Sequence, residues 1–527
     1  MNTTPAELQL AEPFLLGWLS SVGLDVEYVR AEGNTLFYTD AAGEEVPVVD
    51  FAGGYGSVLL GHNHPEISAL ARELIARQVA VHAQFSRHPY ANEVANTLNR
   101  IVQRETGSPE PYSAIFANSG AEAVEAAVKH AELDRGLRLA QLRTELAEHL
   151  AEARAAVAGG TAVSPAAYAL VGLAVPGADR GEAGFEELAA EVTRLNEERT
   201  SRPPVFLTLE GGFHGKLVGS VQLTHNEGYR TPFSTLAAQA RFIPFGRADV
   251  LKAVVEEERV DVLDLVLVDG RVDAVRRNAP VFCAFVLEPI QGEGGIREVD
   301  EDFARAIQQV TAEVDCPIVI DEVQSGMGRT GAFLASSQIG LTGDYYTLAK
   351  SLGGGIAKTS VMLTKQSRYR SEFELVHSST FAKDAFSCHI SQKVLDLLEA
   401  DGGAAYRIAA ERGERLRGAL EAVRADYPDV VKDVRGRGLI LGLEFHDQAG
   451  STSEAIREAA PLLGYTVAGY LLREHRIRTF PTASAVNTLR FEPSLFVSDA
   501  EIDRLEAALR AVGALFRADD GEGLTRW

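Results

Sequence analysis

The chain has 527 residues, 46% of them apolar and 24% charged, which is the composition of an ordinary globular protein long enough for two domains. Its 74 acidic and 51 basic residues give a net charge of −23 at pH 7, and this charge argues against binding to nucleic acids or to anionic membranes. No apolar run approaches the length of a membrane span, the first residues lack the pattern of a signal peptide, and the three cysteines are widely spaced, so we expect a cytoplasmic protein.

The first part of the chain predicts a short helix, paired strands and a glycine-rich loop. A helix is expected around Glu7–Ser21, and residues 27–51 alternate in strand fashion across two turn signals. The segment FAGGYGSVLLGHNHP carries glycines that predict positive φ angles, and Tyr55 within it is either a packing residue or part of a pocket wall. His62 and His64 form a His-x-His pair, but no further ligand stands at a suitable spacing, so we predict no metal site.

A strand followed directly by a helix start is expected at residues 112–122. Tyr112–Ala117 leads into NSGAEAVEAAVKHAE, where Ser119 is a favourable N-cap residue and Glu122, three residues later, completes a capping box. Such a helix start places free backbone amides and the positive end of the helix dipole at the edge of a sheet, where a phosphate would bind. An ordinary helix start explains the same pattern, so this signal depends on support from the rest of the chain.

Residues 131–203 differ in composition from their surroundings. They are rich in Ala, Glu, Leu and Arg around a middle segment that contains Gly and Pro. This composition predicts a mainly helical segment that projects from the main domain. Because strands and helices resume at Val205–Leu209, we interpret this segment as an insert in an alternating α/β domain. It carries no chemical motif, and we expect a solvated arm or a contact between subunits.

Two apolar runs deliver an acidic and a basic side chain to the expected carboxyl edge of a parallel sheet. Pro317–Ile320 ends on Asp321, and Tyr345–Ala349 ends on Lys350, which a run of three glycines follows closely. A buried lysine with a depressed pKa can attack a carbonyl group, and a nearby carboxylate can hold a protonated heterocycle. A solvated surface lysine is the weaker alternative, because an apolar segment precedes it. The pair predicts a Schiff-base cofactor site.

Three further side chains stand in informative surroundings. Phe213, in the glycine-rich segment EGGFHGKLVGS, either packs internally or stacks on a flat ring. The apolar strand that starts at Val281 brings Glu288 to the same sheet edge. Arg490 lies inside an apolar strand, where a buried arginine forms either an internal salt bridge or a bidentate clamp for a substrate carboxylate.

Taken together, the motifs resemble one enzyme family. The segments LGHNHP, NSGAEAVEAA, GGFHGK, EPIQGEGG, IDEVQSGMGRTG, LAKSLGGG, STF and RFEPSL occur in the order found in the class III (ω-type) aminotransferases, which are pyridoxal 5'-phosphate (PLP) enzymes of fold type I. The resemblance runs from about Asp50 to Leu505, apart from the insert.

This resemblance implies an α/β fold with two domains. Residues 91–380 would form a large cofactor-binding domain, with a mostly parallel central sheet flanked by helices and with the helical insert 131–203. Residues 1–90 and 381–527 would together form a smaller α+β domain.

The resemblance also assigns roles to single residues. Lys350 would form the internal aldimine with PLP and then carry the proton between the substrate carbon and the cofactor, and Asp321 would keep the pyridinium nitrogen protonated. The other implied cofactor contacts are Ser119, Gly120 and Ala121 at the phosphate, Phe213 and Val323 on the two ring faces, Gln324 at the phenolic oxygen, Glu288 near the cofactor, and Thr380 at the phosphate of the neighbouring subunit. The contact across subunits implies a homodimer with shared active sites.

Three residues are candidates for binding the substrate. Arg490 stands where the family keeps its clamp for the substrate carboxylate, and Tyr55 is the aromatic residue of the glycine-rich loop. Lys216 follows the Phe-His-Gly segment, where relatives that bind a second carboxylate often have arginine. A lysine there keeps the positive charge but loses the bidentate geometry.

The expected reaction moves an amino group from an amino acid or ω-amine donor to a carbonyl acceptor, both small molecules, through the Lys350 aldimine in a ping-pong mechanism. An alternative keeps PLP and uses the quinonoid for β- or γ-elimination or replacement, carbon–carbon bond formation or racemisation. A silent binding protein would be expected to lose Lys350 or Asp321, and a dinucleotide-binding protein would need a GxGxxG segment after a strand, which the chain lacks.

Overall fold

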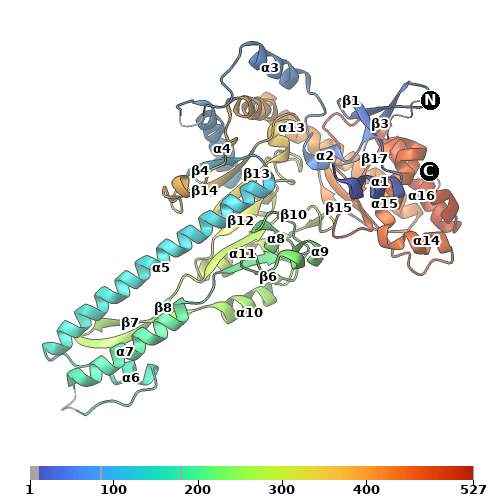
Figure 1. Cartoon of the computed structure of the whole chain (residues 1–527). Coiled ribbons are helices and arrows are strands. Elements are labelled where there is room, and N and C mark those ends of the chain that lie inside the picture. Colours follow the sequence, from blue (N-terminus) through green and yellow to red (C-terminus); the bar gives the residue numbers. More distant parts are fainter. Residues whose placement is uncertain (1–10, 84–85, 178–180, 526–527) are drawn as a thin grey trace, which may run out of the picture.

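A seven-stranded sheet forms the centre of the structure, a computed structural model that describes residues 11–83, 86–177 and 181–525 (Figure 1). In spatial order the strands are β4 (Tyr112–Ala117), β14 (Ser360–Lys365), β13 (Tyr345–Leu348), β12 (Ile318–Asp321), β9 (Phe282–Leu287), β5 (Val205–Leu209) and β6 (Ala240–Ile243). Adjacent strands are parallel except around β14, which runs antiparallel to both β4 and β13. The predicted α/β fold with a mostly parallel central sheet is therefore confirmed.

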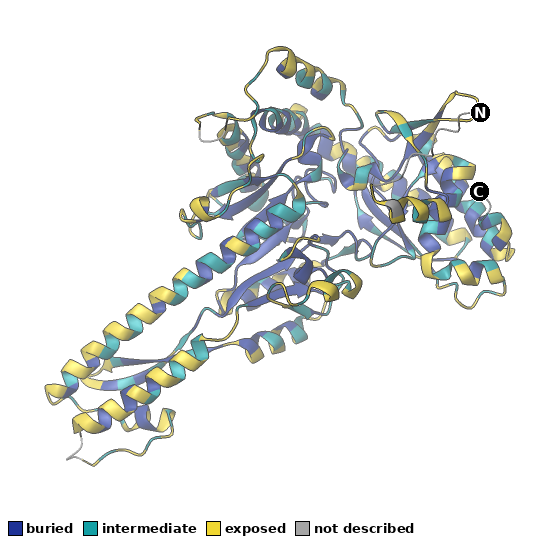
Figure 2. Cartoon of the chain, in the orientation of Figure 1, coloured by how far each residue is buried: buried dark blue, intermediate teal, exposed yellow. Residues whose placement is uncertain are grey.

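Helices lie around this sheet and exclude water from it. They are α4 (Tyr90–Thr106), α5 (Gly120–Ala158), α10 (Ala248–Glu258), α11 (Glu301–Glu313) and α13 (Ala385–Asp426). Figure 2 shows the strands as buried and the outer faces of the helices as exposed. All six residues of β9 and all five of β5 are buried, which explains why these strands have continuous apolar sequences.

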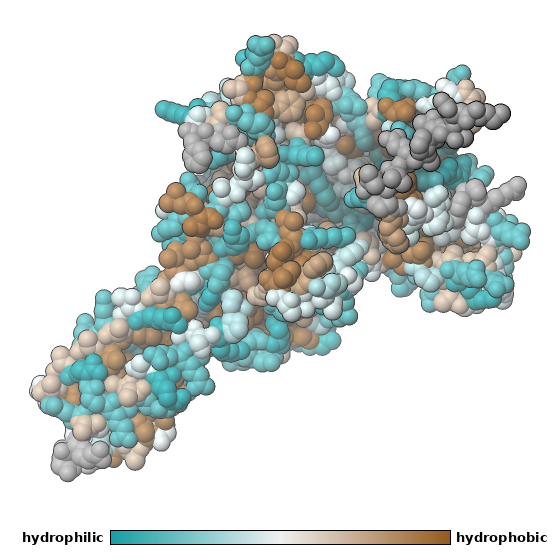
Figure 3. Space-filling model, viewed as in Figure 1, coloured by the Kyte–Doolittle hydropathy of each residue, from teal (hydrophilic) through white to brown (hydrophobic). Residues whose placement is uncertain are grey.

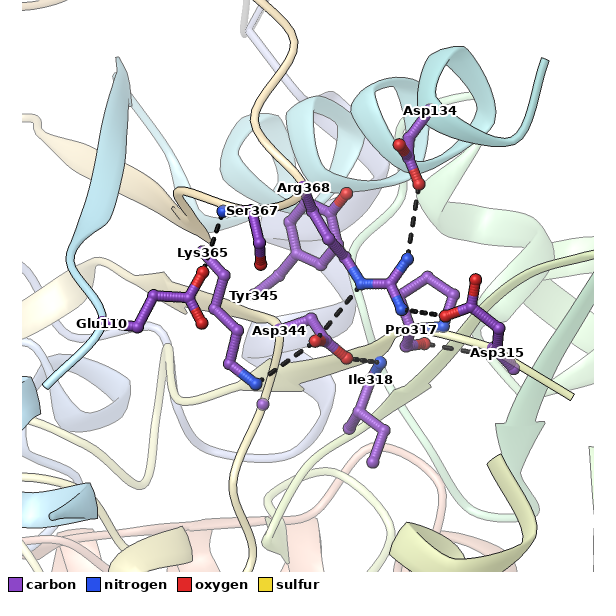
Figure 4. A network of polar contacts seen from close by, with 12 residues as sticks. Glu110, Asp134, Asp315, Pro317, Ile318, Asp344, Tyr345, Lys365, Ser367 and Arg368 are labelled. Carbon is purple, nitrogen blue, oxygen red and sulfur yellow. Dashed lines mark hydrogen bonds and ion pairs between the residues drawn. The ribbon is translucent and has the colours of Figure 1, made fainter. Parts of the chain in front are cut away.

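A polar network fixes the amino ends of β12 and β13 (Figure 4). Asp344, just before β13, accepts a hydrogen bond from the Ile318 amide at 2.9 Å and lies 3.3 Å from Arg368 Nε. The Arg368 guanidinium also contacts Asp315 at 2.5 Å and Asp134 of α5 at 3.4 Å. The network therefore joins two strands and a helix at the edge opposite the predicted site.

The register of β12 and β13 decides what lies at the carboxyl edge. Asp321 pairs with Thr347 across these parallel strands, and Lys350 follows Thr347 by three residues. Both side chains that the sequence singled out therefore leave the sheet at the same edge.

Segments from the two ends of the chain build a second region with two four-stranded sheets. One sheet contains β1 (Tyr28–Glu32), β2 (Thr35–Thr39), β3 (Glu45–Asp50) and β17 (Ile477–Arg478), and the other contains β15 (Val431–Arg437), β16 (Ile440–Phe445), β19 (Thr488–Phe491) and β18 (Phe480–Pro481). The helices here are α1 (Pro13–Ser21), α14 (Glu454–Ala459), α15 (Leu463–His475), α16 (Asp499–Arg517) and α17 (Gly521–Leu524). Because β3 pairs with β17, the blue and red ends of the chain lie side by side in Figure 1, and we propose on this basis that 1–90 and 381–527 share one domain beside 91–380.

Further helices and one short strand pair lie between these elements. They are α2 (Gly53–Gly56), α3 (Pro65–Ala76), α8 (Ser220–Leu223), α9 (Glu227–Arg230), α12 (Phe373–Val376) and the antiparallel pair β10 (Ile290–Gln291) and β11 (Arg297–Glu298). Of the helix expected over Glu7–Ser21, the structure has α1, and the part before residue 11 lies outside the described residues. No helix in the described ranges is both long and apolar enough to cross a membrane.

The predicted insert forms most of an arm that projects from the sheet (Figure 1). Helix α5 continues for 39 residues and is followed by α6 (Pro165–Leu170) and α7 (Gly181–Thr200). A β-hairpin of β7 (Asp261–Val268) and β8 (Arg271–Asn278), from a later part of the chain, lies against these helices. The sequence analysis did not predict this hairpin, although its Asp269–Gly270 turn, with both φ angles positive, is a strong hairpin signal.

The arm has a hydrophobic core of its own. Phe185 and Leu188 of α7 and Leu263 and Leu265 of the hairpin are buried together, in a cluster separate from the core around the central sheet. These buried contacts within the arm stabilise its structure independently of the central sheet.

We expect Phe185→Ala to loosen the arm without loosening the sheet. Loss of this buried ring removes about 3–5 kcal/mol of packing free energy, so amide hydrogen exchange should speed up in residues 144–177, 181–200 and 261–278. The matched control is Phe285→Ala, which removes an equally buried ring from β9 and should speed up exchange across the central sheet. Equal acceleration in β9 and in the arm for Phe185→Ala would contradict a separate core.

Candidate active site

Asp321 lies at the end of β12 in contact with a buried histidine. Asp321 Oδ2 is 2.9 Å from His214 Nδ1, and Asp321 Oδ1 accepts hydrogen bonds from the Val323 amide at 3.1 Å and from the Thr347 hydroxyl at 3.2 Å. Burial lowers the pKa of His214, but the hydrogen bond and the charge of Asp321 outweigh this effect, so the pKa rises overall. A protonated His214 donates to Asp321 and fixes the direction of its carboxylate.

Lys350 follows β13 in a backbone conformation that residues other than glycine rarely adopt. Its φ angle of 49° lies in the left-handed region, where a side chain costs free energy that the surrounding structure must offset. Burial lowers the pKa of its amine, and the carboxylates of Glu492, Glu293 and Asp321 oppose this effect only in part. A lowered pKa leaves more of the amine uncharged near neutral pH, which makes it a better nucleophile toward a carbonyl group.

One cavity of about 300 Å³ joins most of the predicted cofactor contacts. Those that line it are Gly120, Ala121, Phe213, Glu288, Asp321, Val323, Gln324 and Lys350, and the substrate candidate Lys216 lines it as well. Ser119 and Thr380 are both exposed and lie outside its lining, as do Arg490 and Tyr55.

The first turn of α5 forms a cradle at one end of this cavity. The predicted capping box is present, and it engages both the hydroxyl and the amide of Ser119. Within the described part of the chain, the amides of Gly120 and Ala121 have no hydrogen-bond partner. A Cβ atom on Gly120 would lie 2.7 Å from Val323 Cγ1, and one on Gly215 would lie 2.6 Å from Ala121 Cβ, so glycine keeps the cradle open. Two free amides at a helix start suit an anion.

Glu288 is buried beside the wall of the cavity and has a strongly perturbed pKa. Its Oε1 accepts a hydrogen bond from the Phe213 amide at 2.9 Å, and its Oε2 accepts one from the Gly292 amide at 3.0 Å. Burial raises the pKa of Glu288 to about 7; the charge of His214 opposes the rise and that of Asp321 adds to it. Glu288 therefore changes its protonation state near neutral pH.

Arg490 of β19 is fully buried and paired with Glu293. Arg490 Nη1 donates to Glu293 Oε1 at 2.7 Å, Nη2 contacts Glu293 Oε2, and Nη2 also donates to the Pro481 carbonyl at 3.1 Å. Of the two alternatives that the sequence left open, this arrangement is the internal salt bridge. A carboxylate ligand would have to compete with Glu293 for the guanidinium.

A left-handed turn brings Tyr55 next to this pair. The residues of α2, Gly53–Gly56, have φ angles of 51°, 57°, 56° and 84°, and Tyr55 alone among them carries a side chain. Its ring stacks on Phe480 with centroids 5.6 Å apart, and Arg490 Cζ lies 5.0 Å from its centre. The glycines predicted to have positive φ angles do have them.

Asp50, directly before this turn, holds it in place. Its Oδ1 accepts hydrogen bonds from the amides of Ala52 and Gly53 at 3.0 and 3.2 Å and lies 3.1 Å from Arg478 Nη1, and its Oδ2 lies 2.8 Å from His62 Nε2. Burial raises the pKa of Asp50, but contacts with His62 and Arg478 outweigh it and lower the pKa. Across the residues that the structure describes, no group of three or more His, Cys, Asp or Glu side chains is placed to hold a metal ion.

Two further contacts concern Gln324 and Lys216. Gln324 Nε2 donates to Glu492 Oε1 at 2.6 Å, so one of its two amide hydrogens is already engaged. Lys216 Nζ lies 3.8 Å from the centre of the Tyr229 ring, which places a cation at the cavity lining.

Comparison with known families identifies this site. The model of the family described as aminotransferase class-III matches residues 20–512. The chain belongs to the class-III aminotransferases. The fold of this aminotransferase is also similar to solved structures, among them ornithine aminotransferase from Toxoplasma gondii, with a TM-score of 0.64 and 20% identity over 93% of this chain and 92% of that one. Ornithine δ-aminotransferase from Plasmodium falciparum matches with a TM-score of 0.61 and 19% identity over 94% of each chain.

The cavity of this aminotransferase fits the cofactor of its family, PLP. The unpaired amides of Gly120 and Ala121 suit a phosphate, the carboxylate of Asp321 suits a ring nitrogen, and the amine of Lys350 suits a carbonyl carbon. PLP is present at partial occupancy in the Toxoplasma gondii structure.

Sequence analysis missed three residues that the structure brings into the site. His214, Glu293 and Glu492 stand inside the motifs GGFHGK, EPIQGEGG and RFEPSL, but no local pattern indicates which side chain each one faces. The available signal was the presence of charged residues in apolar or glycine-rich surroundings, the same signal that singled out Arg490.

We expect Glu288→Gln to remove a pH dependence from the stability of this aminotransferase. Because the pKa of Glu288 is about 7 in the fold and 4.5 in the unfolded chain, its contribution to stability is full below pH 4.5 and is lost as the pH rises through 7. The free energy of unfolding of the wild type relative to the variant should therefore fall by about 2 kcal/mol between pH 5 and pH 8 in urea titrations.

Glu444→Gln is the matched control. At Glu444 burial is outweighed by hydrogen bonds from Lys432 and Arg435, so the pKa is lowered; its contribution to stability is lost only below pH 4.5, and the difference should stay nearly constant between pH 5 and pH 8. A difference for Glu288→Gln that does not vary with pH would contradict the raised pKa.

Proposed function

We propose that this chain transfers an amino group from an amino acid or ω-amine donor to a carbonyl acceptor in two half-reactions at one site, with Lys350 bound covalently to PLP between turnovers. The observation that supports this most directly is the pairing of β12 with β13, which places Asp321 and Lys350 in the lining of one cavity.

PLP, when bound, supplies an electron-withdrawing ring that stabilises negative charge on the carbon next to the reacting nitrogen. In this proposal Asp321, held by His214, would keep a proton on the ring nitrogen, and Phe213 and Val323 would hold the ring between them. The amides of Gly120 and Ala121 would bind the phosphate, and the second amide hydrogen of Gln324 would be free for the phenolic oxygen. Lys350 Nζ would accept the proton from the donor carbon and donate it in the second half of the transfer.

The Arg490–Glu293 pair supports two kinds of substrate at one site. While the pair is closed, the guanidinium is neutralised and a donor enters with its amine first, its own carboxylate lying toward Lys216. An acceptor with a carboxylate beside its carbonyl group displaces Glu293 and binds Arg490 in a bidentate manner. Tyr55 covers the arginine in both cases.

We further propose that the enzyme is a homodimer with shared active sites, in which Thr380 reaches the phosphate of the neighbouring subunit. Exposed apolar residues support this arrangement, and Figure 3 shows hydrophobic patches beside β4 and β14 and over α8 and α9. The exposed residues in these regions are Leu375, Val376 and Phe381, and Leu217, Val218, Phe233 and Leu236. A cytoplasmic location agrees with the buried free cysteines.

We expect Lys350→Ala to abolish amino transfer, because in this proposal its amine both holds the cofactor and moves the proton. Turnover should fall on the order of 10³-fold or more, and borohydride treatment should no longer fix the cofactor to the peptide that contains residue 350. Lys358→Ala is the control, since Lys358 is exposed eight positions away and should leave both measurements unchanged. With the wild type, a donor supplied alone should yield one equivalent of carbonyl product per site. Amino transfer retained by Lys350→Ala, or continuous product release without an acceptor, would overturn the proposal.

We expect the single change Glu293→Gln and the double change Arg490→Gln with Glu293→Gln to have opposite effects on the use of acceptors that carry an α-carboxylate. The single change frees the guanidinium from its partner, so KM for acceptors with an α-carboxylate should fall. The double change removes the clamp while leaving no unpaired charge, so kcat/KM for the same acceptors should fall by about 100-fold. An amine donor without a carboxylate serves as the control, and an equal loss for that donor would contradict the clamp.

A further inference from the structure

The loop of residues 482–487 joins β18 to β19, the strand that carries Arg490, and the functions above do not use it. Its shape is fixed by hydrogen bonds of its own. The Thr482 amide donates to the Thr488 carbonyl at 2.9 Å, and the Thr482 hydroxyl donates to the Ala485 carbonyl at 2.9 Å. The directions of its backbone amides are therefore set by the protein before a ligand binds.

One amide of this loop binds the carboxylate of Glu293 together with Arg490. The Ala483 N–H donates to Glu293 Oε2 at 2.7 Å, and Arg490 Nη2 contacts the same oxygen. Arg490 Nη1 donates to Glu293 Oε1 at 2.7 Å. The next amide, that of Ser484, donates to the main-chain carbonyl of Glu293 at 3.0 Å and so holds the backbone of that residue. Three N–H groups, two from Arg490 and one from Ala483, thus surround the carboxylate, and we call them the carboxylate site.

The carboxylate site borders the space in which a substrate would bind. Glu293 lines the same cavity as Lys350, so a ligand in this cavity can reach the site once the Glu293 side chain moves away. The Nε atom of Arg490 is buried and has no hydrogen-bond partner among the described residues. The guanidinium therefore has donor capacity that Glu293 leaves unused.

Departure of Glu293 removes the acceptor from all three N–H groups at once. A second carboxylate replaces every bond, because it offers two charged oxygens with the same spacing. A carboxamide cannot do so, since its NH₂ group is itself a donor and would face the guanidinium or the Ala483 amide. A ligand that leaves these donors without an acceptor loses affinity. The chemistry of the site therefore favours a carboxylate.

We propose that the Ala483 amide is the third donor for the substrate carboxylate, which takes the place of Glu293 on Arg490 and is selected over a carboxamide. This inference rests on the proposed function, in which an acceptor displaces Glu293, and it adds a residue that binds the substrate through its backbone. The side chain at position 483 takes no part in this contact.

The test removes the N–H of Ala483 and measures the binding of a carboxylate. In the full-length holoenzyme, Glu293→Ala vacates the carboxylate site, and acetate, which resembles the group removed, is the probe in calorimetric titrations. In the same background, lactic acid incorporated in place of Ala483 turns the amide into an ester and keeps the methyl group. We expect the affinity for acetate to fall about tenfold or more, because a hydrogen bond to a charged group is lost. Acetamide should bind less tightly than acetate and should not respond to the ester.

Lactic acid in place of Ala485 is the matched control. It makes the same chemical change two positions further along the loop, at an amide that donates no backbone hydrogen bond among the described residues, and it should leave the affinity for acetate unchanged. An ester at position 483 that lowers Tm without weakening acetate would overturn the proposal, and so would a Glu293→Ala variant that binds no acetate.

Should Glu293→Ala fail to fold, Glu293→Gln takes its place, because the carboxamide of glutamine suits the site poorly and should yield to acetate. The ester at position 483 is then expected to weaken acetate in the same way. Equal affinity with and without the ester, or no binding at all, rejects the proposal.

The two hypotheses fail in different ways. Acetate binding that depends on the Ala483 amide, in a wild type that transfers no amino group, would reject the proposed function alone. Amino transfer by the wild type, together with acetate binding that is indifferent to the ester, would reject only the role of Ala483.

Discussion

The constraint on which the site depends is the burial of opposite charges at the carboxyl edge of one parallel sheet. Asp321 and Lys350 leave adjacent strands into one cavity, and a charged group removed from water needs a partner. His214 supplies this partner for Asp321. The register that brings them together is fixed at the opposite edge by Asp344 and Arg368, residues that take no part in the chemistry.

The sequence predicted those parts of the site that local patterns encode. Asp321 and Lys350 stand directly after apolar runs, and the cradle at Gly120 has a capping box, so strand ends and a helix start were sufficient to find them. The central sheet was predictable for the same reason, because its buried parallel strands have continuous apolar sequences.

The remaining parts depend on contacts between distant segments. His214 and Asp321 are 107 positions apart, Gln324 and Glu492 are 168 apart, and Glu293 and Arg490 are 197 apart. No periodicity or turn signal carries such information, because the first pairing arises only when the central sheet assembles and the other two only when the C-terminal segment packs against it. The hairpin at 261–278 is a different case, since its turn signal was present in the sequence and was overlooked.

Helix α5 links the chemistry to the most distant part of the molecule. It begins with the free amides of Gly120 and continues without interruption to Ala158 in the arm, a length of about 58 Å at 1.5 Å per residue. A continuous helix behaves as a stiff rod, so a displacement of the arm also moves the helix start at Gly120 and Ala121. A force applied at the tip of the arm is therefore transmitted to the helix start that carries the two free amides.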